Sequence, residues 1–233
     1  MATPYFRQLP SFEYVSRLPD AKISDYIEVK NLFKKGALRP DIFQEVSFFE
    51  KYKITGDDRP DNVAFEIYND SSLDWVILLS NNIINIQSEW PMTQVSFDTY
   101  LREKYGVGLN TEEEIYAKIY NGIHHYETVE IKNSQGVVII PAGLEVPQNY
   151  ASGSSYYDAF RNSQVTLSNV TIPVTNYEYE EKLEDAKRNI FVLKQRYLNI
   201  VLDDMEELMT YKEGSSQYKT GTLKRADNIR LYS

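Results

Sequence analysis

The stretch from Tyr52 to Asn82 is the part of this 233-residue sequence whose residue order most limits the possible fold. Residues 46–55 are rich in β-branched and aromatic side chains interrupted by charged ones, which predicts a half-buried strand. Gly56 ends that strand, because glycine adopts a positive φ without steric cost. Pro60 suits the first position of a helix, so a helix should begin there.

Two short helices are expected after this turn. The first carries one apolar face at helical spacing, formed by Val63, Ala64, Ile67 and Tyr68. The polar run 69–72 interrupts it. Residues 73–79 are apolar nearly all round, which is typical of a second helix buried between neighbours. Asn81 and Asn82 can end that helix in left-handed geometry. The order is therefore strand, helix, helix.

Several short runs resemble stretches of known families. They are the run 56–64, Tyr68, Leu73-Asp74-Trp75-Val76, Pro4-Tyr5-Phe6, Phe12-Glu13-Tyr14 and His124-His125-Tyr126-Glu127. The strand and two helices resemble a LysM-type βααβ module, a small fold best known for binding cell-wall glycan. The runs taken in order resemble the baseplate wedge protein 53 family of T-even-type, contractile-tailed bacteriophages, which carries a LysM-like domain.

The resemblance implies an α+β fold. It would consist of a LysM-like βααβ core with an insertion, an extended aromatic N-terminal segment and C-terminal amphipathic helices. The residues expected in the core of the module are Tyr52, Gly56, Pro60, Val63, Ile67, Leu73, Trp75 and Val76.

The strand that should close the module is displaced in the sequence. Residues 83–94, which follow the second helix, fit a strand poorly. Residues 137–147 contain an apolar run and a Pro-Gly turn that resemble such a closing strand. We therefore hypothesise that residues 46–55 pair with residues 137–147, and that residues 88–134 are an insertion into a module spanning 46–147.

The remaining segments differ in character. The insertion should hold two helices, at 97–105 and 111–120, and Thr111 and Glu114 have capping-box spacing in the second. Residues 148–176 are expected to form a connector of loops and β-prone pieces. Residues 177–213 should be a helical segment, although residues 190–193 could instead form a short strand. Residues 214–233 are expected to be a flexible tail.

Both ends of the chain contain candidates for docking to partners. Residues 1–45 have many aromatics separated by prolines and should lie extended along their own domain or along a partner. The C-terminal helix has one apolar face, which could pack on the parent domain or dock on another subunit. The candidate docking residues are Tyr5, Phe6, Phe12, Tyr14, Val201, Met205, Leu208 and Met209.

Composition excludes several classes of function. No run of about 18 apolar residues exists, so no membrane span is expected, and residues 1–10 do not read as a secretory signal. The absence of cysteine suits assembly in a reducing cytoplasm. A net charge of −9 argues against a nucleic-acid surface and favours protein partners. The nineteen tyrosines fit either the rim of a core or docking surfaces.

No pattern in the sequence indicates catalysis. His124 and His125 are adjacent, so in a strand they should point to opposite faces and could not easily share a metal ion. The acidic runs 112–114 and 203–207 read as a helix start and a solvated helix face. No glycine-rich phosphate loop is present. We therefore expect no catalytic residues, no cofactor and no metal site.

The resemblance implies a structural subunit of a phage tail baseplate wedge. Such a protein would mediate contacts within and between wedges, assemble in the host cytoplasm and reside in the virion. Its partners would be other baseplate wedge proteins and sheath-initiator-type proteins. The alternative is a LysM-type protein that binds peptidoglycan. The single module, the absence of an attached hydrolase and the long insertion argue against that alternative.

Overall fold

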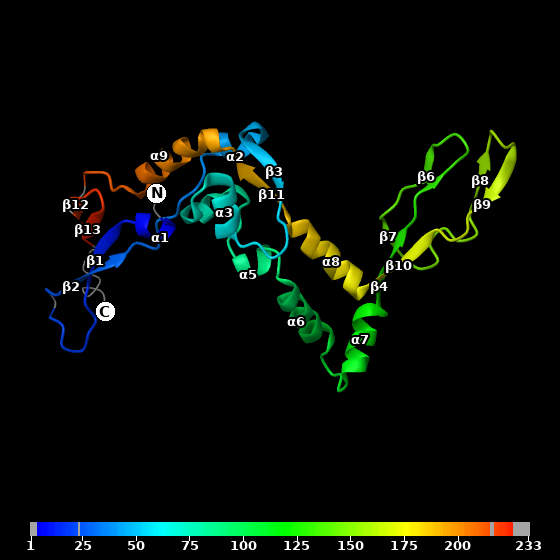
Figure 1. Ribbon diagram of the computed structural model, residues 1–233, viewed down its shortest axis with the longest axis horizontal. Coiled ribbons are helices and arrows are strands. Elements are labelled where there is room, and N and C mark those ends of the chain that lie inside the picture. The colour runs from blue at the N-terminus through cyan, green and yellow to red at the C-terminus, as the bar shows by residue number, and fades with distance from the viewer. Residues whose placement is uncertain (1–3, 23, 215–216, 226–233) are drawn as a thin grey trace. The chain divides into compact units, whose positions relative to one another are not determined.

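The chain folds as two compact units of mixed α+β structure, confirming the predicted class (Figure 1). The computed structural model describes residues 4–22, 24–214 and 217–225. Unit 1 comprises residues 1–90 and 188–233, and unit 2 comprises residues 91–187. Unit 2 is therefore inserted into the sequence of unit 1.

Unit 1 contains the strand and two helices predicted from residues 46–82, together with further short helices and strands. In chain order they are α1 (Tyr5–Gln8), β1 (Ser11–Val15), β2 (Tyr26–Lys30), α2 (Pro40–Gln44), β3 (Phe49–Lys53), α3 (Pro60–Tyr68), α4 (Asp74–Ser80), α5 (Ile86–Glu89), β11 (Asn189–Leu193), α9 (Leu198–Met209), β12 (Tyr218–Thr220) and β13 (Leu223–Arg225). Short 3-10 turns cover Val46–Phe48, Ser71–Leu73 and Gln195–Tyr197.

The turn and helix signals are confirmed at the residues that carry them. Gly56 has φ +56°, and Pro60 is the first residue of α3. Asn69 ends α3 with φ 58°, and Asn82 follows α4 with φ 53°, so asparagine provides both left-handed turns. The first strand is shorter than expected, because residues 46–48 form a 3-10 turn before β3 begins.

The strand that closes the module is β11. It pairs antiparallel with β3, in a register that runs from Lys53 opposite Asn189 to Phe49 opposite Leu193. The hypothesis that residues 46–55 pair with residues 137–147 is wrong, because β6 and β7 in that range pair with β5 and β4. The closing strand must fill a core, and β11 buries three apolar side chains whereas β6 buries one. The alternative of a short strand at 190–193 is confirmed.

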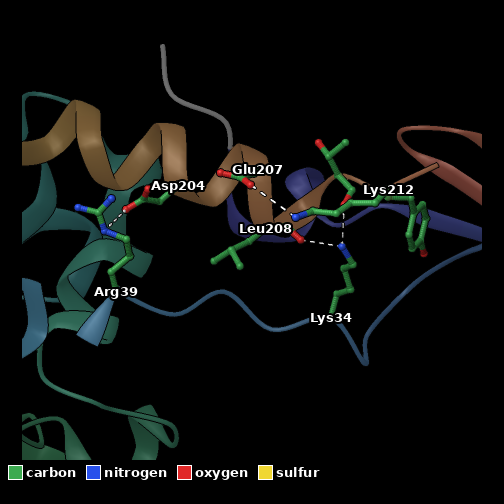
Figure 2. Close-up of a pocket in the computed structure, with 8 residues that line it drawn as sticks. Lys34, Arg39, Asp204, Glu207, Leu208 and Lys212 are labelled. Atoms are coloured by element: carbon green, nitrogen blue, oxygen red, sulfur yellow. Dashed lines mark hydrogen bonds and ion pairs between the residues drawn. The ribbon is translucent and has the colours of Figure 1, made fainter. Parts of the chain in front are cut away.

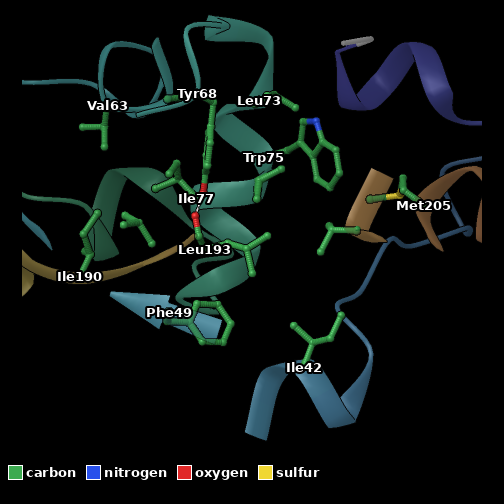
Figure 3. Close-up of a cluster of buried hydrophobic side chains, with 14 of the residues drawn as sticks. Ile42, Phe49, Val63, Tyr68, Leu73, Trp75, Ile77, Ile190, Leu193 and Met205 are labelled. Atoms are coloured by element: carbon green, nitrogen blue, oxygen red, sulfur yellow. Dashed lines mark hydrogen bonds between the residues drawn. The ribbon is translucent and has the colours of Figure 1, made fainter. Parts of the chain in front are cut away.

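The core of unit 1 lies where α3, α4, β11 and α9 meet (Figure 3). Val63, Val76 and Ile77 are fully buried, and the Tyr68 hydroxyl donates a 2.8 Å hydrogen bond to the Leu193 carbonyl. Part of the N-terminal segment packs on this core, since Leu9 and the α2 residue Ile42 are also buried there. Segments distant in the sequence therefore share one apolar cluster.

The two ends of the described chain meet in a second sheet of unit 1. Its strand order is β12-β13-β1-β2, with β1 parallel to β13 and antiparallel to β2. The expected flexible tail is therefore wrong for residues 218–225, which form β12, β13 and their turn. Residues 215–216 and 226–233 of that predicted tail fall outside the described residues.

Unit 2 combines three helices with short strands. They are α6 (Gln94–Tyr105), α7 (Glu112–Tyr120), β4 (Ile123–Thr128), β5 (Ile131–Lys132), β6 (Val138–Ile140), β7 (Glu145–Val146), β8 (Ser155–Asp158), β9 (Ser163–Thr166), β10 (Thr171–Thr175) and α8 (Asn176–Lys187). The two expected helices are present, and the Thr111 side chain caps α7 by accepting from the Glu114 N–H. Strands β10, β4 and β7 form one sheet, and β5-β6 and β8-β9 are hairpins.

Removing apolar volume from α4 should destabilise unit 1. Ile77 has no exposed surface, so Ile77→Ala should lower the free energy of unfolding of unit 1 by about 2–5 kcal/mol through lost burial and a residual cavity. Ile84→Ala makes the same chemical change at a side chain that is 76% exposed, and should change it by less than about 0.5 kcal/mol. Urea unfolding measures both; equal effects would contradict the assigned core.

Candidate protein-docking site

One face of the β1–β2 pair carries partly exposed apolar side chains. Phe12 lies opposite Val29 and Tyr14 opposite Ile27, so these four residues share a face, which we call the β1–β2 face. The Phe12 and Tyr14 rings meet edge to face with centroids 6.2 Å apart. Ile27 is 45% exposed. This face can bury apolar surface against a partner.

Charged contacts on the opposite face hold the sheet together. Glu13 forms ion pairs with Lys219 and Arg225, the latter at 2.8 Å from Nε to Oε2. Hydrogen bonds from Lys219 and then Arg225 lower the pKa of Glu13 below its usual value. The Arg225 guanidinium also lies over the Tyr26 ring, 4.6 Å from its centroid. These contacts fix the strand that presents Phe12 and Tyr14.

The end of α9 borders a pocket of about 380 Å³ (Figure 2). Lys34 Nζ donates to the carbonyls of Leu208 and Thr210 at 2.6 and 3.0 Å, which satisfies backbone groups left open at the helix C-terminus. Burial lowers the pKa of Lys34, and nearby Lys212 lowers it further. Arg39 Nε lies 3.3 Å from Asp204 Oδ2 on the other side of the pocket. The helix end is thus tied to the 31–39 segment.

The predicted docking residues divide into two groups. Val201, Met205 and Met209 are buried in the core of unit 1, as in the alternative in which the α9 face packs on its parent domain. Tyr5 is partly buried, packs on the same core, and its hydroxyl accepts from the Gly36 N–H at 2.9 Å. The exposed or half-buried group is Phe6, Phe12, Tyr14 and Leu208; Phe6 is 69% and Leu208 45% exposed. Phe6 and Leu208 are the most accessible to a partner, and Tyr5, Phe12 and Tyr14 are each partly exposed.

The residues predicted for the module core have different roles. Val63, Leu73, Trp75 and Val76 are buried in the core cluster, and Tyr52 and Ile67 pack against it. Gly56 is an exposed turn residue, and Pro60 is buried at the start of α3.

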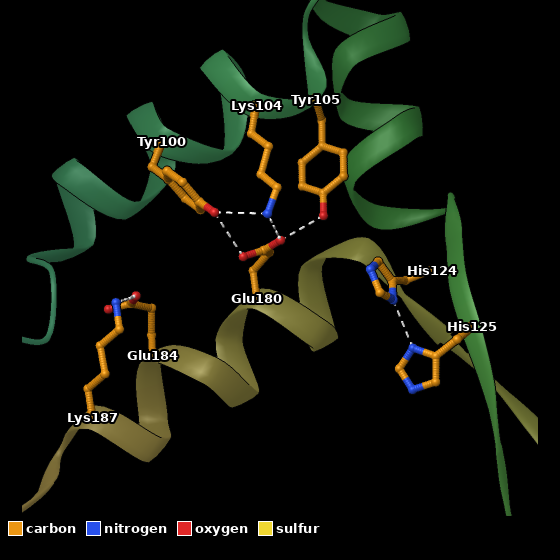
Figure 4. A network of polar contacts seen from close by, with 8 residues as sticks. All are labelled: Tyr100, Lys104, Tyr105, His124, His125, Glu180, Glu184 and Lys187. Atoms are coloured by element: carbon orange, nitrogen blue, oxygen red, sulfur yellow. Dashed lines mark hydrogen bonds and ion pairs between the residues drawn. The ribbon is translucent and has the colours of Figure 1, made fainter. Parts of the chain in front are cut away.

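A buried carboxylate organises the helices of unit 2. Glu180 of α8 accepts hydrogen bonds from Lys104 Nζ at 2.6 Å, Tyr105 at 2.8 Å and Tyr100 at 3.2 Å, all from α6 (Figure 4). Burial alone would raise the pKa of Glu180, but the bonds from Lys104 and Tyr105 outweigh it and lower the pKa. Burial and Glu180 raise the pKa of Tyr105 to about 12. This network fastens α6 to α8. No local sequence pattern indicates it, because Glu180 lies 75 to 80 residues from its partners.

The expectation that the two histidines point to opposite faces is wrong. Their Nδ1 atoms lie 2.9 Å apart (Figure 4), and the His124 ring stacks on Tyr179 with centroids 3.8 Å apart. The β4–β10 register skips His124, since Val174 is opposite His125 and Thr175 opposite Ile123. Such a bulge breaks the alternation of side chains along a strand. The pair packs on α8.

Among the described residues, no group of three or more His, Cys, Asp or Glu side chains could hold a metal ion. No helix in the described ranges is long and apolar enough to cross a membrane.

Comparison with known families decides the class of protein. The family described as base plate wedge protein 53 matches residues 5–208. The chain belongs to the base plate wedge protein 53 family. No curated protein matches the chain. As a member of this family, the protein is a non-enzymatic structural subunit of the phage baseplate. It is part of the virion and associates with other baseplate proteins.

Removing the Glu180 charge should loosen unit 2 of the wedge protein. Glu180→Gln keeps the shape but removes the charge-assisted bonds, so the free energy of unfolding of unit 2 should fall by about 1–3 kcal/mol. Glu113→Gln, at an exposed residue of α7, should change it by less than about 0.5 kcal/mol. Chemical denaturation measures the stability of both variants, and hydrogen exchange in α6 and α8 shows whether the loss is local to the network. Unchanged exchange in Glu180→Gln would contradict the role of the network.

The same carboxylate should make unit 2 sensitive to acid. Its folded-state pKa lies below the ordinary 4.5, so its stabilisation is complete above about pH 4.5 and is lost as the pH falls through the lowered value. The difference in unfolding free energy between wild type and Glu180→Gln should therefore shrink below about pH 4.5. Denaturation measured across pH 3–7 tests this, and a constant difference would contradict it.

Proposed function

We propose that this wedge protein connects neighbouring subunits within and between wedges, using the β1–β2 face and the exposed end of α9 as its contact surfaces. The observation that carries the proposal is the half-exposed apolar face of Phe12, Tyr14, Ile27 and Val29 on a sheet fixed from behind by Glu13. A rigid face binds at lower entropic cost than a flexible one. Leu208 beside the α9 pocket provides a second contact.

We further propose that the order β3, α3, α4, β11 is a LysM-like module used for protein contacts. The antiparallel β3–β11 pair with two intervening helices supports this reading. Residues 91–187 interrupt the module before its last strand. The module would serve as the rigid centre that holds the contact surfaces in place.

Partners of the wedge protein would be other wedge subunits and sheath-initiator-type proteins, met during assembly in the host cytoplasm. The β1–β2 face offers four apolar residues and the end of α9 offers Leu208, so single contacts would be weak. Two contacts made by one rigid unit add through effective concentration. The mechanism is therefore geometric, with no chemical step.

Charge placed on the β1–β2 face should block assembly without unfolding the protein. Ile27→Lys puts a cation on a surface that must be desolvated, so its incorporation into wedges should fall at least about tenfold. Ile84→Lys is the matched control, since Ile84 is exposed and lies outside this face. Reconstitution with the other wedge proteins, with circular dichroism to check folding, measures the effect. Normal incorporation of Ile27→Lys would exclude this face.

The glycan-binding alternative has little support at the turn before α3. The Gly56 carbonyl accepts from Arg188 at 2.6 Å, and the Asp58 carbonyl accepts from the Trp90 ring N–H at 2.9 Å. Internal bonds therefore already use one acceptor position of each carbonyl.

We expect the purified protein not to bind insoluble peptidoglycan. Sedimentation with the polymer should leave it in the supernatant, and an established LysM domain serves as the positive control. Saturable retention that is lost on Gly56→Val would instead favour the glycan-binding alternative.

A further inference from the structure

The two edges of the β3–β11 sheet differ in whether their backbone groups are satisfied. At the β11 edge, Asn81 Nδ2 donates to the Phe191 carbonyl and the Phe191 N–H donates to Asn81 Oδ1, both at 2.8 Å. One side-chain amide thus occupies the position that a residue of a neighbouring strand would take. The outer edge of β11 is closed at this point.

The β3 edge is open. Because the Phe191 N–H and C=O point toward Asn81, Lys51 opposite Phe191 belongs to a non-hydrogen-bonded pair, and its own N–H and C=O point away from β11. Lys53, two residues on, has the same orientation. Among the described residues β3 has no second neighbouring strand. Two consecutive outward-facing residues therefore present donors and acceptors to the outside.

On one face of β3 the exposed side chains are basic, whereas Glu50 is exposed on the other face. Lys51 and Lys53 are exposed on one face of β3, although the whole chain carries a net charge of −9. A hollow of about 400 Å³ lies against both strands of the pair, lined by Lys51, Tyr52, Lys53, Asn189, Ile190 and Phe191. The outer edge of β3 thus combines backbone groups for a ladder with positive charge.

We infer that the β3 edge binds an extended, acidic segment of another protein, which adds to the sheet as a third strand. Residues of that segment opposite Lys51 and Lys53 share a face with them, so acidic side chains at alternate positions would pair with both lysines. Backbone hydrogen bonds would supply affinity and the lysines specificity.

A second copy of this chain is disfavoured as the occupant. Antiparallel pairing of two β3 edges would bring lysines against lysines, and like charges opposite one another destabilise a sheet. Lysines on an edge strand commonly prevent such self-association. They do not oppose an acidic strand, whose charge complements theirs.

A peptide experiment on the full-length protein tests the ladder and the charge separately. The probe is a short capped peptide of alternating glutamate and valine, compared with the same peptide N-methylated at its glutamates and with a lysine-valine peptide. Fluorescence anisotropy should show the unmodified acidic peptide binding at least about tenfold tighter than either comparison. Equal binding of the N-methylated peptide, or no binding of the acidic one, would overturn the inference.

Charge reversal locates the binding to this edge. The double variant Lys51→Glu with Lys53→Glu should reverse the preference, weakening the acidic peptide and strengthening the basic one by about tenfold each. Lys22→Glu with Lys35→Glu changes the net charge equally at exposed lysines elsewhere in unit 1, and should leave the preference unchanged. Equal effects of the two double variants would overturn the inference.

The natural partner can be sought without any substitution. Carbodiimide joins lysine to a carboxylate in direct contact, so treated baseplates should yield cross-links from Lys51 or Lys53 to alternate Asp or Glu residues of another subunit. Lys22 and Lys35 serve as reference lysines. Cross-links from the reference lysines only would overturn the inference, whereas failure of Ile27→Lys to block assembly would affect only the proposed function.

Discussion

The pairing of β3 with β11 is the interaction on which the rest of unit 1 depends. It joins segments more than 130 residues apart, so its formation must overcome the entropic cost of closing a long loop. The pair persists because β11 is buried against α3 and α4, and because the Tyr68 hydroxyl binds the Leu193 carbonyl at its end. Buried apolar surface thus stabilises a strand pair that would be marginal alone. The docking surfaces are presented by the unit that this pairing completes.

Local signals predicted the helices and turns well because each depends on a few adjacent residues. Gly56, Pro60 and Asn69 have backbone preferences that hold in any context, and the structure uses all three as expected. The partner of β3 could not be predicted in this way. Residues 137–147 and 189–193 are both apolar and extended, and only the shape of the core between α3 and α4 selects the second. Which strands pair depends on residues that lie far apart in the sequence.

In the candidate site, too, local patterns were predicted correctly and long-range contacts were not. The amphipathic pattern of α9 correctly predicted a helix with an apolar face, but Met205 packs inside its own unit, and periodicity does not say which surface a face meets. The β1–β2 face required the register, which places Ile27 beside Tyr14. At His124 a bulge overrides the alternation that the sequence implied. In each case tertiary contacts supply what the pattern lacks.

The bonds at the turn before α3 also have a mechanical consequence. Trp90 is the last residue of unit 1 before unit 2 begins and Arg188 is the first after it ends; both donate to carbonyls of the same turn, at Asp58 and Gly56. The two connections to unit 2 are therefore anchored side by side. A force that pulls on unit 2 is shared by both connections at this single place, instead of stretching unit 1 between distant points. The same arrangement lets residues 91–187 be lengthened, shortened or exchanged during evolution while the β3–β11 pair keeps its register.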